Sequence, residues 1–345
     1  MRHSIRVYTT LGATMGLACW GVVTLPAAST WPGTAGTIWV ANRGAHSIRG
    51  FDAATGAVVR TVPMATNSQP GDLAYANGKL YVAEEFGASP AVVVVDEDTG
   101  ETLTRIIPPG GIRPHHVHAS PGGTLVAVGL YGTDKVAIID THADMLIGTW
   151  DVDPDASTAR VHAAVFSNSG RTIYLTSDAT SEVIAMDPFT GTVLWRLAVP
   201  GAHELAITHD ERIAYVSRRT ANRIAVIDLT QPYGYEDRLE VGLPDTLRLS
   251  ANEKLLTVGL RTTPARLAVV NTETFEHTLV TLGRPDELTT LGAHQWTAPN
   301  GRYTFAAYEG GTAPGVAVID HPAGHVVVDR WPYPGRPHGV THAHP

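Results

Sequence analysis

The most regular hydrophobic pattern in the chain is a five-residue segment that recurs seven times. Each copy begins with Val, Ile or Leu and ends with Asp or, once, Asn. The seven copies are residues 48–52, 92–96, 136–140, 183–187, 224–228, 267–271 and 316–320. Their spacing is roughly 40–45 residues, the length typical of a four-stranded propeller blade. The pattern therefore predicts seven blades.

A second set of short β-rich segments supports the same count. Each segment follows a turn and precedes one of the Asp-ended copies. The seven segments are 38–42, 80–83, 125–128, 173–176, 214–217, 256–259 and 303–306. Thr-Gly turns follow several of the terminal aspartates, as at Asp52, Asp96 and Asp187. An Asp side chain can bond the backbone of such a turn, so we assign these aspartates a structural role.

The first blade lacks its first strand at the N-terminal end of the chain. A candidate for that strand, residues 337–342, lies at the other end. Pairing it beside 38–42 would close the ring and remove the exposed sheet edges. We therefore predict an all-β fold, a single seven-bladed β-propeller over residues 29–345.

The repeats resemble those of the YVTN family of β-propellers. The best copy combines Arg113, Pro114 and His115 with a Ser-Pro-Gly-Gly turn at 120–123 and the strand 136–140. The resemblance covers about residues 36–345. It implies the fold but no single function, because such propellers include binding proteins and cofactor-carrying enzymes.

Charge and the N-terminal segment restrict partners and location. The formal net charge of −8 disfavours nucleic acid or an anionic membrane as partner. Residues 1–28 have the form of a signal peptide, with Arg2 and Arg6 before an apolar run. We expect a secreted or cell-envelope protein; a lipid anchor at Cys19 is the alternative. Cys19 is the only cysteine, so any soft metal in the mature chain would be bound by histidine. No other segment predicts membrane insertion.

Histidine recurs near the start of the predicted first strands. These strands line the central channel, so their N-terminal ends converge at one mouth. Alignment places His115, His162, His203 and His338 at one position, with Asp72 and Asp245 at the same height in other blades and His294 in register with His116. Neutral imidazole is a common ligand of transition metals. The candidate metal ligands are His115, His116, His162, His203, His294 and His338.

Residues 115–118 read His-His-Val-His. Strand alternation places His116 and His118 on one face and His115 on the other, unless a bulge intervenes. The string is similar to the His-His-x-His segment of nitrous oxide reductase, whose seven-bladed propeller houses a multi-histidine copper cluster. That resemblance implies copper, but it spans only these residues.

Residues that follow the second strands should rim the same mouth. Tyr131, Glu85 and Glu309 are candidate proton carriers. Candidate substrate-binding residues are Arg43, Asp178, Arg219, Arg261 and Trp296, with packing between blades as the alternative for Trp296. Arginine favours a carboxylate or phosphate ligand.

These observations predict a metal-dependent enzyme acting on a small molecule in the central funnel. A histidine-rich, carboxylate-poor ligand set favours copper or iron and redox chemistry, with zinc or manganese as alternatives. A metal-dependent lyase is one alternative. A non-catalytic propeller that binds a ligand or a protein partner is the other.

Overall fold

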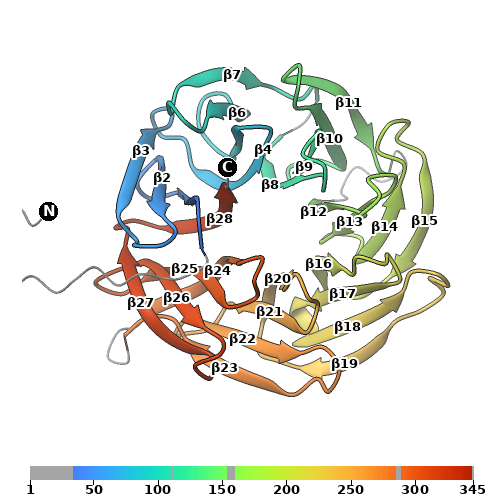
Figure 1. The fold of residues 1–345 in the computed structure, drawn as a ribbon. Coiled ribbons are helices and arrows are strands. Elements are labelled where there is room, and N and C mark those ends of the chain that lie inside the picture. Colours follow the sequence, from blue (N-terminus) through green and yellow to red (C-terminus); the bar gives the residue numbers. More distant parts are fainter. Residues whose placement is uncertain (1–33, 111, 154–159, 285–288, 344–345) are drawn as a thin grey trace, which may run out of the picture.

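Seven four-stranded antiparallel sheets surround a central axis in the computed structural model of this chain (Figure 1). The structure describes residues 34–343 except 111, 154–159 and 285–288. The expected leader 1–28 and Cys19 lie outside the described residues. The predicted seven-bladed β-propeller is confirmed.

Each blade consists of consecutive strands, except the blade that joins the two ends of the chain. That blade orders β28 (Pro337–Ala343), β1 (Thr37–Asn42), β2 (Ser47–Asp52) and β3 (Val58–Pro63). The next three blades are β4 (Pro70–Ala76), β5 (Lys79–Glu84), β6 (Ala91–Asp96) and β7 (Thr102–Ile106); β8 (Pro114–Ala119), β9 (Leu125–Leu130), β10 (Lys135–Asp140) and β11 (Met145–Asp151); and β12 (Val161–Phe166), β13 (Ile173–Ser177), β14 (Glu182–Met186) and β15 (Val193–Ala198). The last three are β16 (Ala202–Ile207), β17 (Ile213–Arg218), β18 (Arg223–Asp228) and β19 (Glu236–Glu240); β20 (Pro244–Leu249), β21 (Leu255–Leu260), β22 (Arg266–Asn271) and β23 (His277–Thr281); and β24 (Thr289–Thr297), β25 (Tyr303–Gly310), β26 (Gly315–Asp320) and β27 (Val326–Pro332).

The hydrophobic core is divided among the interfaces between blades. Seven apolar clusters each join residues of two neighbouring blades. For example, Tyr81 and Val94 pack with Val126 and Ile139 of the next blade. Full burial of such a side chain stabilises the fold by about 1.5–3 kcal/mol. Both faces of the second and third strands are therefore apolar, whereas outer strands such as β15 alternate between half-buried and exposed residues.

The ring closes as the sequence predicts. Strand β28 pairs antiparallel with β1, with Ile38 opposite His342 and Val40 opposite Val340. The Tyr333 hydroxyl lies 2.9 Å from Ser47 Oγ and secures the same junction. The turn aspartates are structural too, since Asp52 and Asp96 accept hydrogen bonds from the backbone of their own turns.

Every innermost strand carries a β-bulge near its N-terminal end. In β8 the bulge falls between Pro114 and Val117, where three residue steps oppose two on β9. A bulge inserts one unpaired residue and re-aims the side chains beside it. His115 and His116 consequently both face the channel, and strict alternation does not hold here.

The bulges arrange the channel side chains in two tiers. The upper tier contains His115, His162, His203, Asp245 and His338. The lower tier, one residue further along each strand, contains Asp72, His116, Glu204 and His294. The expectation that Asp72 lies at the height of His115 is therefore wrong: Asp72 Oδ2 lies 3.3 Å from His116 Nδ1, and Asp72 Oδ1 contacts His294.

Candidate functional site

A cavity of about 520 Å³ opens at the mouth of the channel where the inner strands begin. The end of each second strand returns to this mouth, so both predicted sets of polar residues contribute to the wall. Its lining residues are Arg43, Gln69, Glu85, Phe86, Arg113, His115, His116, Tyr131, His162, His203, Arg219, Asp245, Arg261, His294, Arg336 and His338. All six predicted histidines are among them.

The six imidazole rings form a continuous chain around the channel. His162 is central, with ring centroids 3.6 Å from His203, 4.3 Å from His116 and 4.8 Å from His115. The chain continues from His116 to His294 at 4.6 Å and from there to His338 at 4.4 Å. Five of the seven blades thus contribute at least one ring, and the closing strand β28 supplies that of its blade.

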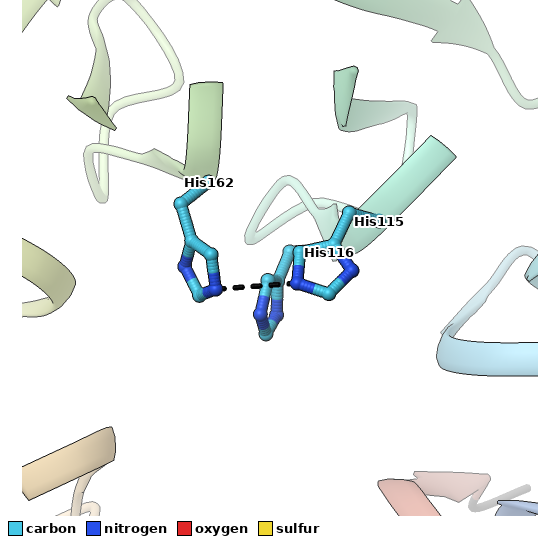
Figure 2. A group of neighbouring side chains, drawn as sticks. All are labelled: His115, His116 and His162. Atoms are coloured by element: carbon cyan, nitrogen blue, oxygen red, sulfur yellow. Dashed lines mark hydrogen bonds between the residues drawn. The ribbon is translucent and has the colours of Figure 1, made fainter. Parts of the chain in front are cut away.

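Three of these rings present nitrogen atoms to a common point. His115, His116 and His162 each have a ring nitrogen within 4.8 Å of the others. The Nε2 atoms of His115 and His162 lie 3.2 Å apart, and His116 lies between and below them (Figure 2). The Nδ1 atom of His162 is buried and has no hydrogen-bond partner among the described residues. These three residues are the best-placed candidate ligands.

Oxygen atoms lie against the opposite nitrogen of several rings. His294 Nδ1 is 3.1 Å from Asp72 Oδ1, and His338 Nδ1 is 2.9 Å from the Gly71 carbonyl oxygen. His115 Nδ1 is 2.8 Å from Glu85 Oε1. An acceptor at Nδ1 fixes the tautomer that leaves Nε2 free for a metal. The arrangement is the one found around metal-ligating histidines.

Burial lowers the pKa of four of the six imidazoles; at His116 the Glu204 and Asp72 carboxylates outweigh burial and raise the pKa. Burial lowers the pKa of His115 from 6.5 to about 4, even though the Glu85 carboxylate acts in the opposite direction. Burial and the neighbouring imidazoles hold the pKa of His162 well below its ordinary value. The pKa values of His294 and His338 are lowered as well, chiefly by burial. Neutral imidazole is the form that binds metals.

His203 has different surroundings. Its Nδ1 and Nε2 atoms each lie 2.8 Å from a carboxylate oxygen, on Asp178 and Asp245 respectively. Burial opposes its protonation, but the two carboxylates raise its pKa. Arg219 Nη1 also donates to Asp245 Oδ1 at 3.1 Å. His203 is therefore part of an ion-pair network beside the three converging histidines, although it contacts His162.

The rim is rich in cations, several of them paired. Arg43 contacts Glu85, and Arg336 Nε donates to Glu309 Oε2 at 2.9 Å. Arg261 Nη1 is 3.8 Å from Asp245 Oδ2 and is more than a third exposed. The side chains of Arg261 and Arg336 nevertheless remain partly exposed at the mouth of the cavity.

The remaining predicted residues occupy varied places. The Tyr131 hydroxyl donates to Asp178 Oδ2 at 3.0 Å, and burial followed by the Asp178 charge raises the pKa of Tyr131. Glu309 is buried behind Arg336 and does not line the cavity. Trp296, expected in the substrate pocket, packs instead against the core cluster of Phe305, with its ring centroid 4.2 Å from that of His342.

Sequence reasoning did not single out Glu204, Arg113 or Arg336 as site residues. Arg113 and Arg336 line the cavity from the residue before β8 and before β28, and each precedes a Pro-His pair, so the repeat contained a signal for them too. Glu204 follows His203 as His116 follows His115, so the alignment itself contained a signal for the lower tier.

Comparisons with known proteins agree with this architecture. The family described as "Lactonase, 7-bladed beta-propeller" matches residues 108–263. The uncharacterized protein YncE of Salmonella typhimurium strain LT2 is 23% identical over 236 residues, which is 65% of this chain and 66% of that protein. The match thus spans just under two thirds of the relative. Both findings support a seven-bladed propeller family; neither shows a copper site like that of nitrous oxide reductase.

Solved structures with the same architecture include proteins that are named for different activities. Periplasmic gluconolactonase PpgL of Pseudomonas aeruginosa is 18% identical, with a TM-score of 0.67 over 90% of this chain and 99% of that one. Dihydro-heme d1 dehydrogenase NirN is 16% identical, with a TM-score of 0.64 over 93% of this chain and 78% of that one. Hydrazine synthase of Kuenenia stuttgartiensis is 18% identical, with a TM-score of 0.66 over 83% of this chain and 92% of that one. At these identities the likeness shows the fold alone.

Within the described residues, no helix has the length and apolar character needed to cross a membrane.

Proposed function

We propose that the cavity is the active site of a metal-dependent enzyme that acts on a small, anionic, oxygen-rich molecule. The observation that carries the proposal is the convergence of His115, His116 and His162, with ring nitrogens within 4.8 Å of one another. Three imidazoles satisfy a mononuclear site that keeps a position open for substrate. His294 and His338 continue the ring and are further candidate ligands; His203 would support the site through its carboxylates.

The donor set favours copper or iron, since imidazole suits both, and accommodates zinc or manganese less specifically. A bound ion would supply either redox chemistry or polarisation of a carbonyl or water. Arg219 and Arg261 would bind a carboxylate of the substrate at the mouth. Arg43 would orient Glu85, and Glu85 would in turn hold the His115 ring. Tyr131 lies beside His115, with ring centroids 4.9 Å apart, and would move a proton through Asp178.

A second candidate reaction is hydrolysis of a lactone. It is favoured by the lactonase family match, whose residues 108–263 include the strands that carry His115, His116 and His162. A lactone of a sugar acid is also small and rich in oxygen. In this version the same cavity would bind the ring ester, with the arginines around the developing carboxylate. A lyase acting on a related sugar acid would use the same residues for proton transfer.

Export is part of the proposal. Residues 1–28 would direct the chain to the cell envelope or outside the cell, where the histidine site would acquire its metal.

The experiment is a turnover screen of protein loaded separately with copper, iron, zinc or manganese. Sugar acids and lactones would be the substrates, with oxygen uptake and acid release as the two readouts. We expect turnover by wild type and by His277→Ala, whose histidine is exposed on an outer strand, and none by His162→Ala. Oxygen uptake would select redox chemistry, and acid release alone would select lactone hydrolysis. Retained ligand binding with no turnover under any condition would contradict an enzyme and favour a binding propeller.

A further inference from the structure

Glu204 lies below the cavity with a side chain that is fully buried. Neither of its carboxylate oxygens accepts a hydrogen bond from any described residue. Burial of an ionised carboxylate is costly unless a cation or several donors compensate it. Such an unsatisfied carboxylate in the interior requires an explanation.

The neighbours of this carboxylate are nitrogen atoms that also lack partners. His118 Nε2 lies 3.6 Å from Glu204 Oε1, and His116 Nδ1 lies 3.6 Å from Glu204 Oε2. Both nitrogens are buried and without a hydrogen-bond partner among the described residues. A separation of 3.6 Å is too long for a hydrogen bond. Four polar atoms thus face one another without bonding.

The separations are those expected around a metal ion. Two ligand atoms at 2.0–2.2 Å from a tetrahedral ion are about 3.3–3.6 Å apart. The two contacts of Glu204 agree with this range, and so does the 3.3 Å between His116 Nδ1 and Asp72 Oδ2. His116, His118 and Glu204 also have ligand atoms within 4.8 Å of one another as a group.

We propose a second metal site in the channel, formed by Glu204, His118 and Nδ1 of His116. The mixed carboxylate and imidazole donors suit a divalent first-row ion such as zinc, manganese or iron(II).

The inner site differs from the active site proposed above. His118 lies two residues further along β8 than His116, and neither His118 nor Glu204 lines the cavity. The side chain of His118 is 13% exposed, so the inner site is not sealed from the channel. His116 adjoins both sites, and an imidazole can bind one ion at each nitrogen. The inference stands on the Glu204 geometry and does not require the proposed activity.

The test is zinc stoichiometry, measured by mass spectrometry on refilled, untagged protein. We expect two zinc ions per chain in wild type and in the control His277→Ala. Glu204→Gln and His118→Gln should each retain one ion, and so should the double variant His115→Ala/His162→Ala. Circular dichroism would establish that each variant is folded.

The two proposals fail in different ways. If folded Glu204→Gln and His118→Gln both keep the wild-type zinc content, the inner site is overturned while the outer site stands. If only these two variants lose an ion, the outer site fails and the inner site stands. A crystal of the zinc-loaded wild type provides a check that needs no variant. A zinc-edge anomalous peak between Glu204 and His118 would support the site, and its absence would overturn it.

Discussion

The Nε2 atoms of His115 and His162 lie 3.2 Å apart, although the two residues belong to different blades and are 47 positions apart in the chain. Each is the second residue of an inner strand, and each lies within the bulge that turns it into the channel. The blade repeat therefore brings distant histidines together, and the bulge orients them. Glu85 Oε1 lies 2.8 Å from the far nitrogen of His115, Nδ1, whereas Nδ1 of His162 has no hydrogen-bond partner among the described residues.

Replacement of Glu85 by glutamine should weaken metal binding without removing a ligand. Glu85 Oε1 is 2.8 Å from His115 Nδ1, and loss of such a supporting carboxylate typically costs 10–100-fold in metal affinity. We expect a loss of about that size in chelator competition. Glu101→Gln, at an exposed position in a surface turn, is the control. Equal affinities of Glu85→Gln and wild type would show that Glu85 does not support the ring.

Gly129 should be intolerant of any side chain because of its neighbour across the blade interface. A Cβ at this position would meet the His162 carbonyl oxygen at 2.6 Å and the Val161 carbonyl oxygen at 3.0 Å. Gly129→Ala must therefore displace β12 and the His162 ring with it. We expect a loss of about 1–3 kcal/mol in the free energy of unfolding, together with weaker metal binding.

The matched control for this change is Gly122→Ala, where a Cβ would meet nothing within 4 Å. Urea unfolding and metal titration would be compared for the two variants. If Gly129→Ala were as stable as Gly122→Ala and bound metal equally well, the rigid contact between β9 and β12 would not position His162.

Acid should destabilise the metal-free protein through His321, which lies outside the channel. Burial, followed by the charge of His325, lowers the pKa of His321 from 6.5 to about 4. Between pH 6.5 and about 4, the unfolded chain therefore binds a proton on His321 that the folded chain does not. The free energy of unfolding consequently falls as the pH falls through this range. His321→Gln should reduce the slope of unfolding free energy against pH by up to about 1.4 kcal/mol per unit.

Urea unfolding in the presence of a chelator, at pH values between 4.5 and 7, would measure these slopes. Exposed His277→Gln should retain the wild-type slope. Parallel profiles for wild type and His321→Gln would contradict the assignment.

The sequence predicts the parts of this structure that depend on repetition. Seven copies of one strand pattern are enough to predict seven blades, and the unpaired strand at 337–342 predicts the ring closure seen between β28 and β1. Convergence of the histidines also follows from the repeat, because all first strands begin at one mouth. These are consequences of topology and need no knowledge of side-chain packing.

The sequence could not predict local backbone irregularity or the environments that depend on it. Period-two alternation assigns His115 and His116 to opposite faces, whereas the bulge turns both inward. The carboxylates around His203 come from two other strand ends, and their effect on its pKa depends on distances of 2.8 Å. The position of Trp296 after His294 is compatible with the pocket wall or with packing between blades, and the structure places its large apolar ring against the core near Phe305.

The central claim is that the upper histidines hold a transition metal. The most direct measurement is the metal content of the untagged protein from residue 29 onward, by inductively coupled plasma mass spectrometry, beside His115→Ala/His162→Ala and the control His277→Ala. We predict near-stoichiometric copper, iron, zinc or manganese in wild type and control, and at least one ion fewer per chain in the folded double variant. Equal metal content in all three proteins, or none in wild type after loading with each metal, would contradict the claim.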